Sequence, residues 1–460
     1  MSTKKPDTTS QPASTQAAGS LDPTFGINGV VTLKAPDITQ TSLYIQGITS
    51  NLTSEADQRI YACAGGASKV FIIRLLQDGE IDTTFGNAGY LTLPTGDPAS
   101  NYGLTIHRYI FLGSGKIIGW GEIITVPFEK FMVPAAVCFT VDGILDTSFG
   151  DQGLAIFKPF VPKTPSESNF NPSAGRSIRA RLLNLIEAED GGTAGSTTAI
   201  RQADGKLLLL GSTNHVSTYY HIASYLMRIN IDGSLDTGFG QEGVLLIEDP
   251  ENSTLPHCQH FDIDRRGGIV VTGTHYGLRS PVLIARYDAQ GDVDRSFGKN
   301  GVVHINSPYD NACHARGVMA LDDGKIVMIA AFFLAEVISQ HAAVIKLLPN
   351  GDRDPTFNNG EPALIDLAPE GYLVTSNTTM DDGNRIVVGG GIFPGSEPGF
   401  ISRVLPNGEL DTGFGVNGTA VLEQFYPVTR TAIQNRVNIL AVANDRNAEP
   451  QQSCLIRVVG

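Results

Sequence analysis

Positive charge, cysteine and long apolar runs are all scarce in this chain of 460 residues. The 33 lysines and arginines are outnumbered by 47 aspartates and glutamates, so the formal net charge is -14. Nucleic-acid phosphates and anionic membrane surfaces would be repelled by this charge, which argues against both as partners. No apolar run is long enough to span a bilayer, so membrane insertion is not expected either.

The cysteines are few and far apart, and their number is odd: Cys63, Cys138, Cys258, Cys313 and Cys454. This pattern argues against a disulfide framework and predicts small buried apolar residues. The first twenty residues, MSTKKPDTTSQPASTQAAGS, lack the apolar segment of a Sec signal peptide. We therefore expect a cytoplasmic protein, or export by a route other than Sec, with a disordered polar tail over residues 1–19.

Glycine, in contrast, is abundant: there are 51 glycines and 25 prolines, while only 17% of the residues are charged. This balance is typical of a turn-rich β protein. The clearest feature is a short motif that occurs seven times. Its copies are LDPTFGING, IDTTFGNAG, LDTSFGDQG, LDTGFGQEG, VDRSFGKNG, RDPTFNNG and LDTGFGVNG, with their aspartates at Asp22, Asp82, Asp146, Asp236, Asp294, Asp354 and Asp411.

Each copy belongs to a longer unit. Consecutive motif aspartates are 60, 64, 90, 58, 60 and 57 residues apart, so the third unit carries an insertion over about residues 158–197. A strand such as FIIRLLQDGE precedes the motif and a run such as GVVTL follows it, while a DGKLLLLG-type strand and a weaker strand complete the unit. Seven units of about four antiparallel strands predict an all-β, seven-bladed β-propeller over residues 20–460.

These residues resemble the bacterial delta-sixty repeat, whose hallmark is LDxxFGxxG together with DGKIxxxG and xxLxRxxxDG strands in each unit. The resemblance runs from Leu21 to the C-terminus. It implies a propeller-like repeat protein and says little about activity.

The two ends of the chain complement one another. The final SCLIRVVG matches the arginine-bearing strand of the other units and then stops, whereas the first motif has no such strand before it. We therefore expect residues 29–33 to complete the last blade beside residues 454–459 and so to close the ring.

The motif itself is interpreted as a turn between the third and outer strands, in which Asp accepts backbone N–H groups and Phe packs between blades. Unit six departs from the pattern because Asn358 stands where the others have glycine, and asparagine also tolerates positive φ. Calcium is the alternative role for the aspartates, but no further acid recurs at a fixed spacing to complete such a site.

Departures from the repeat are where a specific function would reside, and they gather in loops predicted to lie on one face of the ring. These loops mix aromatic rings with short polar groups, a combination suited to sugars, because rings cover the C–H face and polar groups bind the hydroxyls. Packing between loops is the alternative for each ring. The candidates are Trp120, Tyr219, Tyr220, His221, His275, Tyr276, Tyr309, Asp310, Asn311, Phe425 and Tyr426.

Histidines concentrate in the fourth and fifth units. His257, His260 and His314, with neighbouring cysteines, are weak candidates for a zinc site because their spacing fits no established ligand pattern. We therefore expect no metal and no cofactor. The insertion contains SIRARLLNLIEAEDGG, whose apolar spacing predicts a short amphipathic helix packed on its own blade or docked on a partner.

Catalytic signatures are missing: the sequence has no G-x-S-x-G, no H-E-x-x-H and no P-loop. The sequence therefore favours a non-enzymatic binding protein, with glycans as the ligand class. A protein-interaction scaffold is the first alternative. A hydrolase or lyase at the mouth of the channel, with His257, His260 and His314, is the second.

Overall fold

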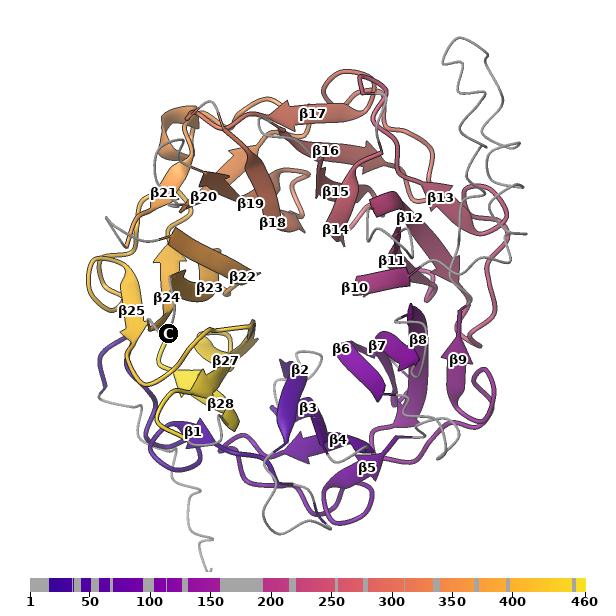
Figure 1. Ribbon diagram of the computed structural model, residues 1–460, viewed down its shortest axis with the longest axis vertical. Coiled ribbons are helices and arrows are strands. Elements are labelled where there is room, and N and C mark those ends of the chain that lie inside the picture. The colour runs from indigo at the N-terminus through magenta and orange to yellow at the C-terminus, as the bar shows by residue number, and fades with distance from the viewer. Residues whose placement is uncertain are drawn as a thin grey trace, which may run out of the picture.

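The computed structural model describes residues 16–34, 36, 43–50, 58–66, 69–93, 103–112, 114–125, 131–157, 193–214, 221–252, 255–275, 280–309, 311–333, 340–367, 372–393, 398–448 and 452–460. These residues form seven four-stranded antiparallel sheets around a central axis (Figure 1). The predicted all-β, seven-bladed propeller is therefore confirmed. Among the described residues, no helix is long and apolar enough to cross a membrane.

The first four blades follow one another along the chain, each from its inner to its outer strand. Blade 1 contains β2 (Tyr44–Ser50), β3 (Ile60–Gly66), β4 (Lys69–Leu75) and β5 (Tyr90–Thr92). Blade 2 contains β6 (Gly103–Phe111), β7 (Lys116–Thr125), β8 (Phe131–Thr140) and β9 (Leu154–Ile156). Blade 3 contains β10 (Thr193–Arg201), β11 (Leu207–Asn214), β12 (His221–Ile229) and β13 (Val244–Leu246). Blade 4 contains β14 (His257–Ile263), β15 (Ile269–Thr274), β16 (Val282–Tyr287) and β17 (Val302–Ile305).

The last three blades end at the seam of the ring. Blade 5 contains β18 (Cys313–Ala320), β19 (Ile326–Phe333), β20 (Gln340–Leu347) and β21 (Ala363–Ile365), with the 3-10 turn η1 (Asn358–Gly360) before β21. Blade 6 contains β22 (Tyr372–Met380), β23 (Ile386–Phe393), β24 (Gly399–Val404) and β25 (Thr419–Leu422). Blade 7 contains β26 (Arg430–Gln434), β27 (Asn438–Asp445), β28 (Gln452–Val458) and, from the other end of the chain, β1 (Val30–Val31).

Closure of the ring follows the prediction. Val30 pairs with Ile456 and Val31 with Leu455, so the N-terminal strand supplies the outer edge of blade 7. The backbone N–H of Gly19 also donates to the Val459 carbonyl at 2.8 Å. Ordered contacts therefore begin before the end of the predicted tail, whose residues 1–15 lie outside the described part of the chain. The helix predicted in the insertion lies outside it as well.

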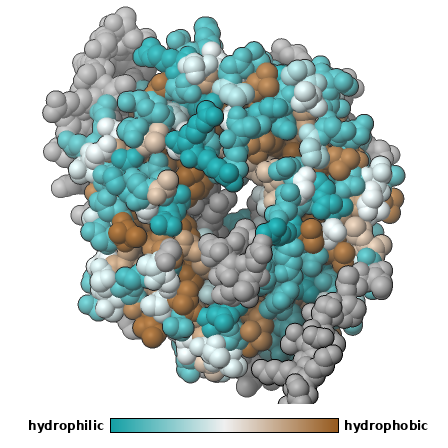
Figure 2. Space-filling model, turned by 180° about the vertical axis from the view of Figure 1, so that it is seen from behind, coloured by the Kyte–Doolittle hydropathy of each residue, from teal (hydrophilic) through white to brown (hydrophobic). Residues whose placement is uncertain are grey.

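Because the strands alternate in direction, the loops fall on two opposite faces. The motif turns and the hairpins between first and second strands share one, which we call the motif face. The connections between blades and the loops between second and third strands share the other, which we call the connection face. Viewed from behind, the ring has a largely polar surface with apolar patches and an opening near its centre (Figure 2).

Each motif contributes one buried phenylalanine to the core between two neighbouring blades, as predicted. Seven apolar clusters, each spanning two adjacent blades, make up this core. Every cluster holds one motif ring, and all seven are at most 1% exposed: Phe25, Phe85, Phe149, Phe239, Phe297, Phe357 and Phe414. The five cysteines are buried and free of disulfides.

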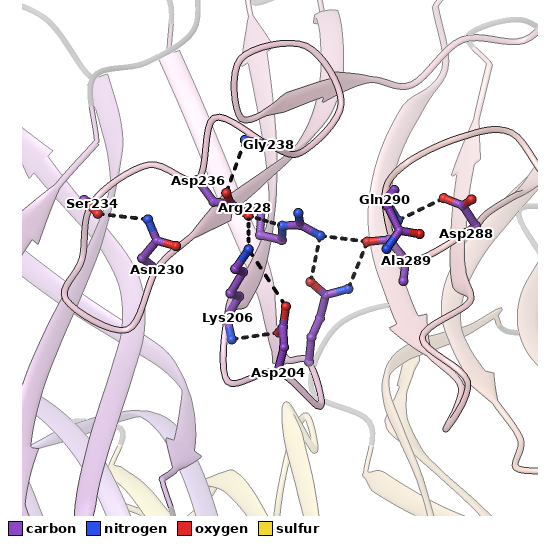
Figure 3. A network of polar contacts seen from close by, with 11 residues as sticks. Asp204, Lys206, Arg228, Asn230, Ser234, Asp236, Gly238, Asp288, Ala289 and Gln290 are labelled. Carbon is purple, nitrogen blue, oxygen red and sulfur yellow. Dashed lines mark hydrogen bonds and ion pairs between the residues drawn. The ribbon is translucent and has the colours of Figure 1, made fainter.

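The motif aspartate binds the third strand of its own blade. In blade 3 the Arg228 Nε donates to the Asp236 Oδ2 at 2.5 Å, and the Arg228 side chain continues to the Ala289 carbonyl of blade 4 at 2.7 Å (Figure 3). The guanidinium also lies 4.7 Å from the centre of the Phe239 ring. One arginine thus links a turn, a ring and the next blade. We call this arrangement the arginine lock.

The lock recurs with variations. Arg74, Arg403 and Arg457 pair with Asp82, Asp411 and Asp22 at 2.7–2.9 Å and lie over the corresponding rings. Blade 2 has Cys138 in place of the arginine, and Lys116 from the neighbouring strand pairs with Asp146 at 2.5 Å instead. In blade 5, Lys346 lies over Phe357 while Lys325 pairs with Asp354 at 2.9 Å.

The residue after the phenylalanine joins the blades through the backbone. The Gly86 N–H donates to the Asp142 carbonyl of the next blade at 2.8 Å. Its φ is +51°, and a Cβ there would lie 2.3 Å from the Tyr90 carbonyl oxygen, so glycine is required. Asn358 takes this place in unit six with a φ of +46° and still donates, to the Asn407 carbonyl at 2.7 Å. The turn of unit six therefore keeps its positive φ and its link to the next blade.

The seam should depend on its lock more than blade 2 depends on its Lys116–Asp146 pair. Asp22 and Arg457, 435 residues apart, are both at most 5% exposed, so Asp22→Asn leaves a buried guanidinium without its counter-charge. We expect the free energy of unfolding to fall by about 3–5 kcal/mol in urea titrations. The matched control is Asp146→Asn, whose partner Lys116 is 39% exposed and stays hydrated. Equal losses in the two variants would contradict the assignment.

The locks should also make the stability of the protein depend on pH. Burial raises the pKa of Asp354, but hydrogen bonds from Thr356 and Lys325 outweigh it and lower the pKa to about 2. Between pH 3.8, the ordinary pKa of an aspartate, and pH 2, the Asp354 carboxyl group is protonated in the unfolded chain but still ionised in the folded protein. The free energy of unfolding therefore falls as the pH drops toward 2. We expect the difference in unfolding free energy between wild type and Asp354→Asn to shrink by up to about 2 kcal/mol between pH 5 and pH 2. A difference that does not change with pH would refute this.

Candidate functional site

The polar cluster that the repeat does not explain lies in blade 4, toward the connection face. Its three central residues come from separate segments. Asp249 follows β13 in the connection to blade 4, His275 follows β15, and His304 lies on β17 near its end. Antiparallel pairing brings the end of β15 and the end of β17 to the same side of the blade, where the connection from blade 3 arrives.

Asp249 is fixed by its own turn. The N–H of Glu251 donates to the Asp249 Oδ1 at 2.9 Å, and the N–H of Asn252 donates to the Asp249 carbonyl at 3.2 Å. The carboxylate has no exposed surface. Its second oxygen, Oδ2, remains directed at the histidines.

Two imidazoles meet this oxygen. The Nε2 atoms of His275 and His304 lie 2.8 Å and 2.7 Å from the Asp249 Oδ2. The His275 side chain is 3% exposed, whereas that of His304 is 22% exposed and gives the cluster its contact with solvent. Beyond His304, the Glu251 Oε2 lies 3.8 Å from its Nδ1, and Lys299 forms an ion pair with the other Glu251 oxygen.

The charge of the site follows from these contacts. Burial on its own raises the pKa of Asp249. Hydrogen bonds from His304 and the Glu251 N–H, the charge of His304 and the hydrogen bond from His275 outweigh this effect, so the pKa is lowered. Asp249 is therefore a carboxylate at neutral pH.

The arrangement can serve as a hydrogen-bonded unit or as a ligand set. The three ligand atoms lie within 4.8 Å of one another, and among the described residues no other three-residue cluster of histidine, cysteine and acid is so close. Two imidazole nitrogens and one carboxylate oxygen suit a divalent transition metal.

The strand register shows that the repeat does not require His304. On the outer strands of blades 1 to 6, one residue in each blade occupies the position of His304 and pairs with the equivalent residue of the third strand. They are Thr92, Ile156, Leu246, His304, Leu364 and Val421. A histidine at a position otherwise taken by threonine or aliphatic residues is a feature of blade 4 itself.

Of the residues predicted to bind a ligand, His275 belongs to this cluster. Trp120 and Phe425 do not fit the prediction. They are 0% and 1% exposed and belong to the cores between blades, because the middle of β7 and the start of the last connection turn these rings inward. These two rings are therefore reassigned to packing.

Other predicted residues lie near the neighbouring junction. Tyr309 is half-buried and stacks on His341, with ring centres 5.6 Å apart, while the Asn311 Oδ1 accepts the N–H of Ala312 at 2.8 Å. Tyr426 packs beside Gly391 in blade 6. Tyr219, Tyr220, Tyr276 and Asp310 lie outside the described residues, and for His221 the structure describes the backbone.

The three histidines considered for zinc are not part of the cluster. The His314 ring packs edge-on against Phe333 at 4.7 Å, and its pKa is lowered by burial, by Arg316 and by His257. Burial also lowers the pKa of His257. His260, on β14, pairs with Thr272 of β15. The sequence signal that was missed is the combination of Asp249 in IEDPEN with His304 in VVHIN, which only the register of β17 brings together.

Comparison with known proteins supports the architecture. Residues 202–239, in blade 3, and residues 321–357, in blade 5, match a family described as "Domain of unknown function (DUF5122) beta-propeller". The comparison with curated proteins gives no match.

Several solved structures are similar in shape at low identity. A protein of unknown function from Dyadobacter fermentans DSM 18053 is 11% identical with a TM-score of 0.41, covering 78% of this chain and 95% of its own. Prolyl oligopeptidase B from Galerina marginata is 11% identical with a TM-score of 0.45, covering 91% of this chain. The present chain spans 51% of that protein. An ulvan lyase, a polysaccharide lyase bound to a saccharide, is 9% identical with a TM-score of 0.42, covering 72% of this chain and 73% of its own.

The cluster should contribute measurably to stability. Asp249→Asn replaces an acceptor of two imidazoles with a neutral amide and leaves buried polar atoms poorly matched, so we expect a loss of about 1–3 kcal/mol in unfolding free energy. Hydrogen exchange should speed up in residues 247–252 and in β17. Asp288→Asn, an exposed turn residue of the same blade, is the control and should change stability by less than about 0.5 kcal/mol. A loss of unfolding free energy no larger than that of the control would show that the cluster does not stabilise the fold.

Proposed function

We propose that the protein is a non-enzymatic ligand-binding propeller that recognises carbohydrate through the connection face, chiefly at blades 4 and 5. We also propose that it is a bacterial member of the delta-sixty repeat group, on the strength of the seven LDxxFGxxG copies. The observation that carries the functional proposal is a separation of roles. The arginine locks and motif turns occupy the motif face, while the polar and aromatic side chains that the repeat does not need lie toward the connection face.

Blade 4 and the junction with blade 5 supply the chemistry. Asp249, His275 and His304 provide fixed acceptors and donors, and the half-buried Tyr309, stacked on His341, adds an aromatic ring in the next connection. Aromatic, carboxylate, imidazole and amide groups on one face of the ring suit the mixed apolar and hydroxyl surface of a sugar. The negative net charge argues against nucleic acid as a partner.

A protein-interaction scaffold is the second candidate, and one specific observation favours it. Ile27 and Val416 are 81% and 77% exposed. They occupy the same position of the motif in blades 7 and 6, which are neighbours, so they lie on the same side of the ring. Exposed aliphatic side chains at corresponding points of adjacent blades are suited to a protein surface.

A glycan array separates these candidates. We expect the purified protein to bind a restricted set of glycans, and Tyr309→Ala or Asn311→Ala to weaken that binding at least about tenfold, the scale of one lost hydrogen bond or aromatic contact. Asn87→Ala, an exposed change on the motif face, is the control and should leave binding unchanged.

The array is repeated after treatment with a chelator, so that direct recognition is distinguished from recognition through a bound cation. Absence of selective binding at high protein concentration would overturn the carbohydrate proposal. The protein-interaction candidate is then tested by Ile27→Ser with Val416→Ser in partner-capture experiments.

A further inference from the structure

We propose that Asp249, His275 and His304 form a binding site for one divalent transition-metal ion, zinc in particular. The ligand atoms are the Asp249 Oδ2 and the Nε2 atoms of the two histidines, all within 4.8 Å of one another. Nothing in the repeat architecture calls for this trio, and the proposal does not depend on the carbohydrate function above.

The donor set selects the class of ion. Zinc in proteins takes imidazole nitrogen at about 2.0–2.1 Å and carboxylate oxygen at about 2.0–2.2 Å, commonly with three protein ligands and one open position. Calcium requires six to eight oxygen ligands and magnesium an octahedron of oxygen, so two imidazoles argue against both. Ligand atoms already within 4.8 Å need only small side-chain rotations to surround a single ion.

The contacts in the structure are consistent with a site poised for a cation. One carboxylate oxygen faces two imidazole nitrogens at 2.7 Å and 2.8 Å, although its carboxylate is fully buried. The turn at Glu251 holds the other oxygen, so the Oδ2 is kept pointing at the histidines. Preorganisation of this kind reduces the conformational cost of binding.

A second carboxylate lies behind one ligand. When Nε2 binds a metal, the ring proton must sit on Nδ1, and metal-bound histidines usually donate that proton to a carboxylate, carbonyl or water. The Glu251 Oε2 lies 3.8 Å from the His304 Nδ1 and is itself fixed by Lys299. A slight rotation of Glu251 would complete this contact. The metal-bound orientation of His304 is therefore supported by charge of the correct sign.

Access is provided by His304. Its side chain is 22% exposed while Asp249 and His275 are buried, so an ion enters past His304 and keeps its open position toward solvent. Water, or an oxygen of a bound ligand, would occupy that position. The site thus offers a link between metal binding and recognition at the connection face.

The first experiment is titration of zinc alone into the full chain, prepared without a histidine tag and treated with chelator, followed by calorimetry. We expect one ion per chain. His304→Thr introduces the residue that blade 1 carries at the equivalent position, Thr92, and should weaken zinc binding at least about a hundredfold. His257→Gln removes an imidazole outside the trio and should leave affinity unchanged.

The second experiment uses the wild-type protein, so a folding defect in a variant does not affect it. X-ray absorption at the zinc edge should show two imidazole nitrogens and carboxylate oxygen at about 2.0–2.2 Å. A sulfur-containing shell, a shell of oxygen only, or no stoichiometric binding would overturn the proposal. So would equal affinity in wild type and His304→Thr. None of these results bears on whether the protein binds glycans without metal.

Discussion

The structure depends on the pairing of one basic side chain with the aspartate of the motif. A four-stranded blade cannot bury both of its faces alone, so each must adhere to its neighbours. In blade 3, Arg228 neutralises Asp236, covers the Phe239 ring and reaches the Ala289 carbonyl of blade 4. The same atoms therefore fix the turn within a blade and the angle between blades. Variation of the pair, as at Lys116 or Lys346, is tolerated because charge and ring coverage can come from different strands.

The locks constrain the sequence on one face of the ring and leave the sequence on the other face less constrained. The locks and motif turns occupy the motif face, where nearly every copy must obey the same geometry. Loops on the connection face do not take part in the locks, so their sequences can differ without disturbing the ring. The cluster of Asp249, His275 and His304 lies toward the connection face, and its His304 belongs to β17, whose position is set by pairing with β16.

The fold could be predicted from the sequence because its determinants are local and repeated. An arginine eight residues before an aspartate, a DG or NG turn and an FG pair recur at one spacing, and closure followed from the strand missing at one end and present at the other. The site could not be predicted in the same way. His304 and Asp249 are 55 residues apart, and their meeting depends on strand register and on the course of one connection. Trp120, a ligand candidate with packing as its alternative, is buried in the middle of β7, and burial at that point has no local signature.

The seam imposes an order in time. Val30 and Val31 leave the ribosome hundreds of residues before Leu455 and Ile456, the residues with which they pair. During synthesis the growing arc has two unfinished ends, and its first motif holds an aspartate, Asp22, with no cation. In blades 1, 3 and 6 the two residues of the lock are only eight residues apart in the sequence. The ring can therefore close only at the end of synthesis, when the N-terminal strand β1, which is made first, pairs with the C-terminal strand β28, which is made last.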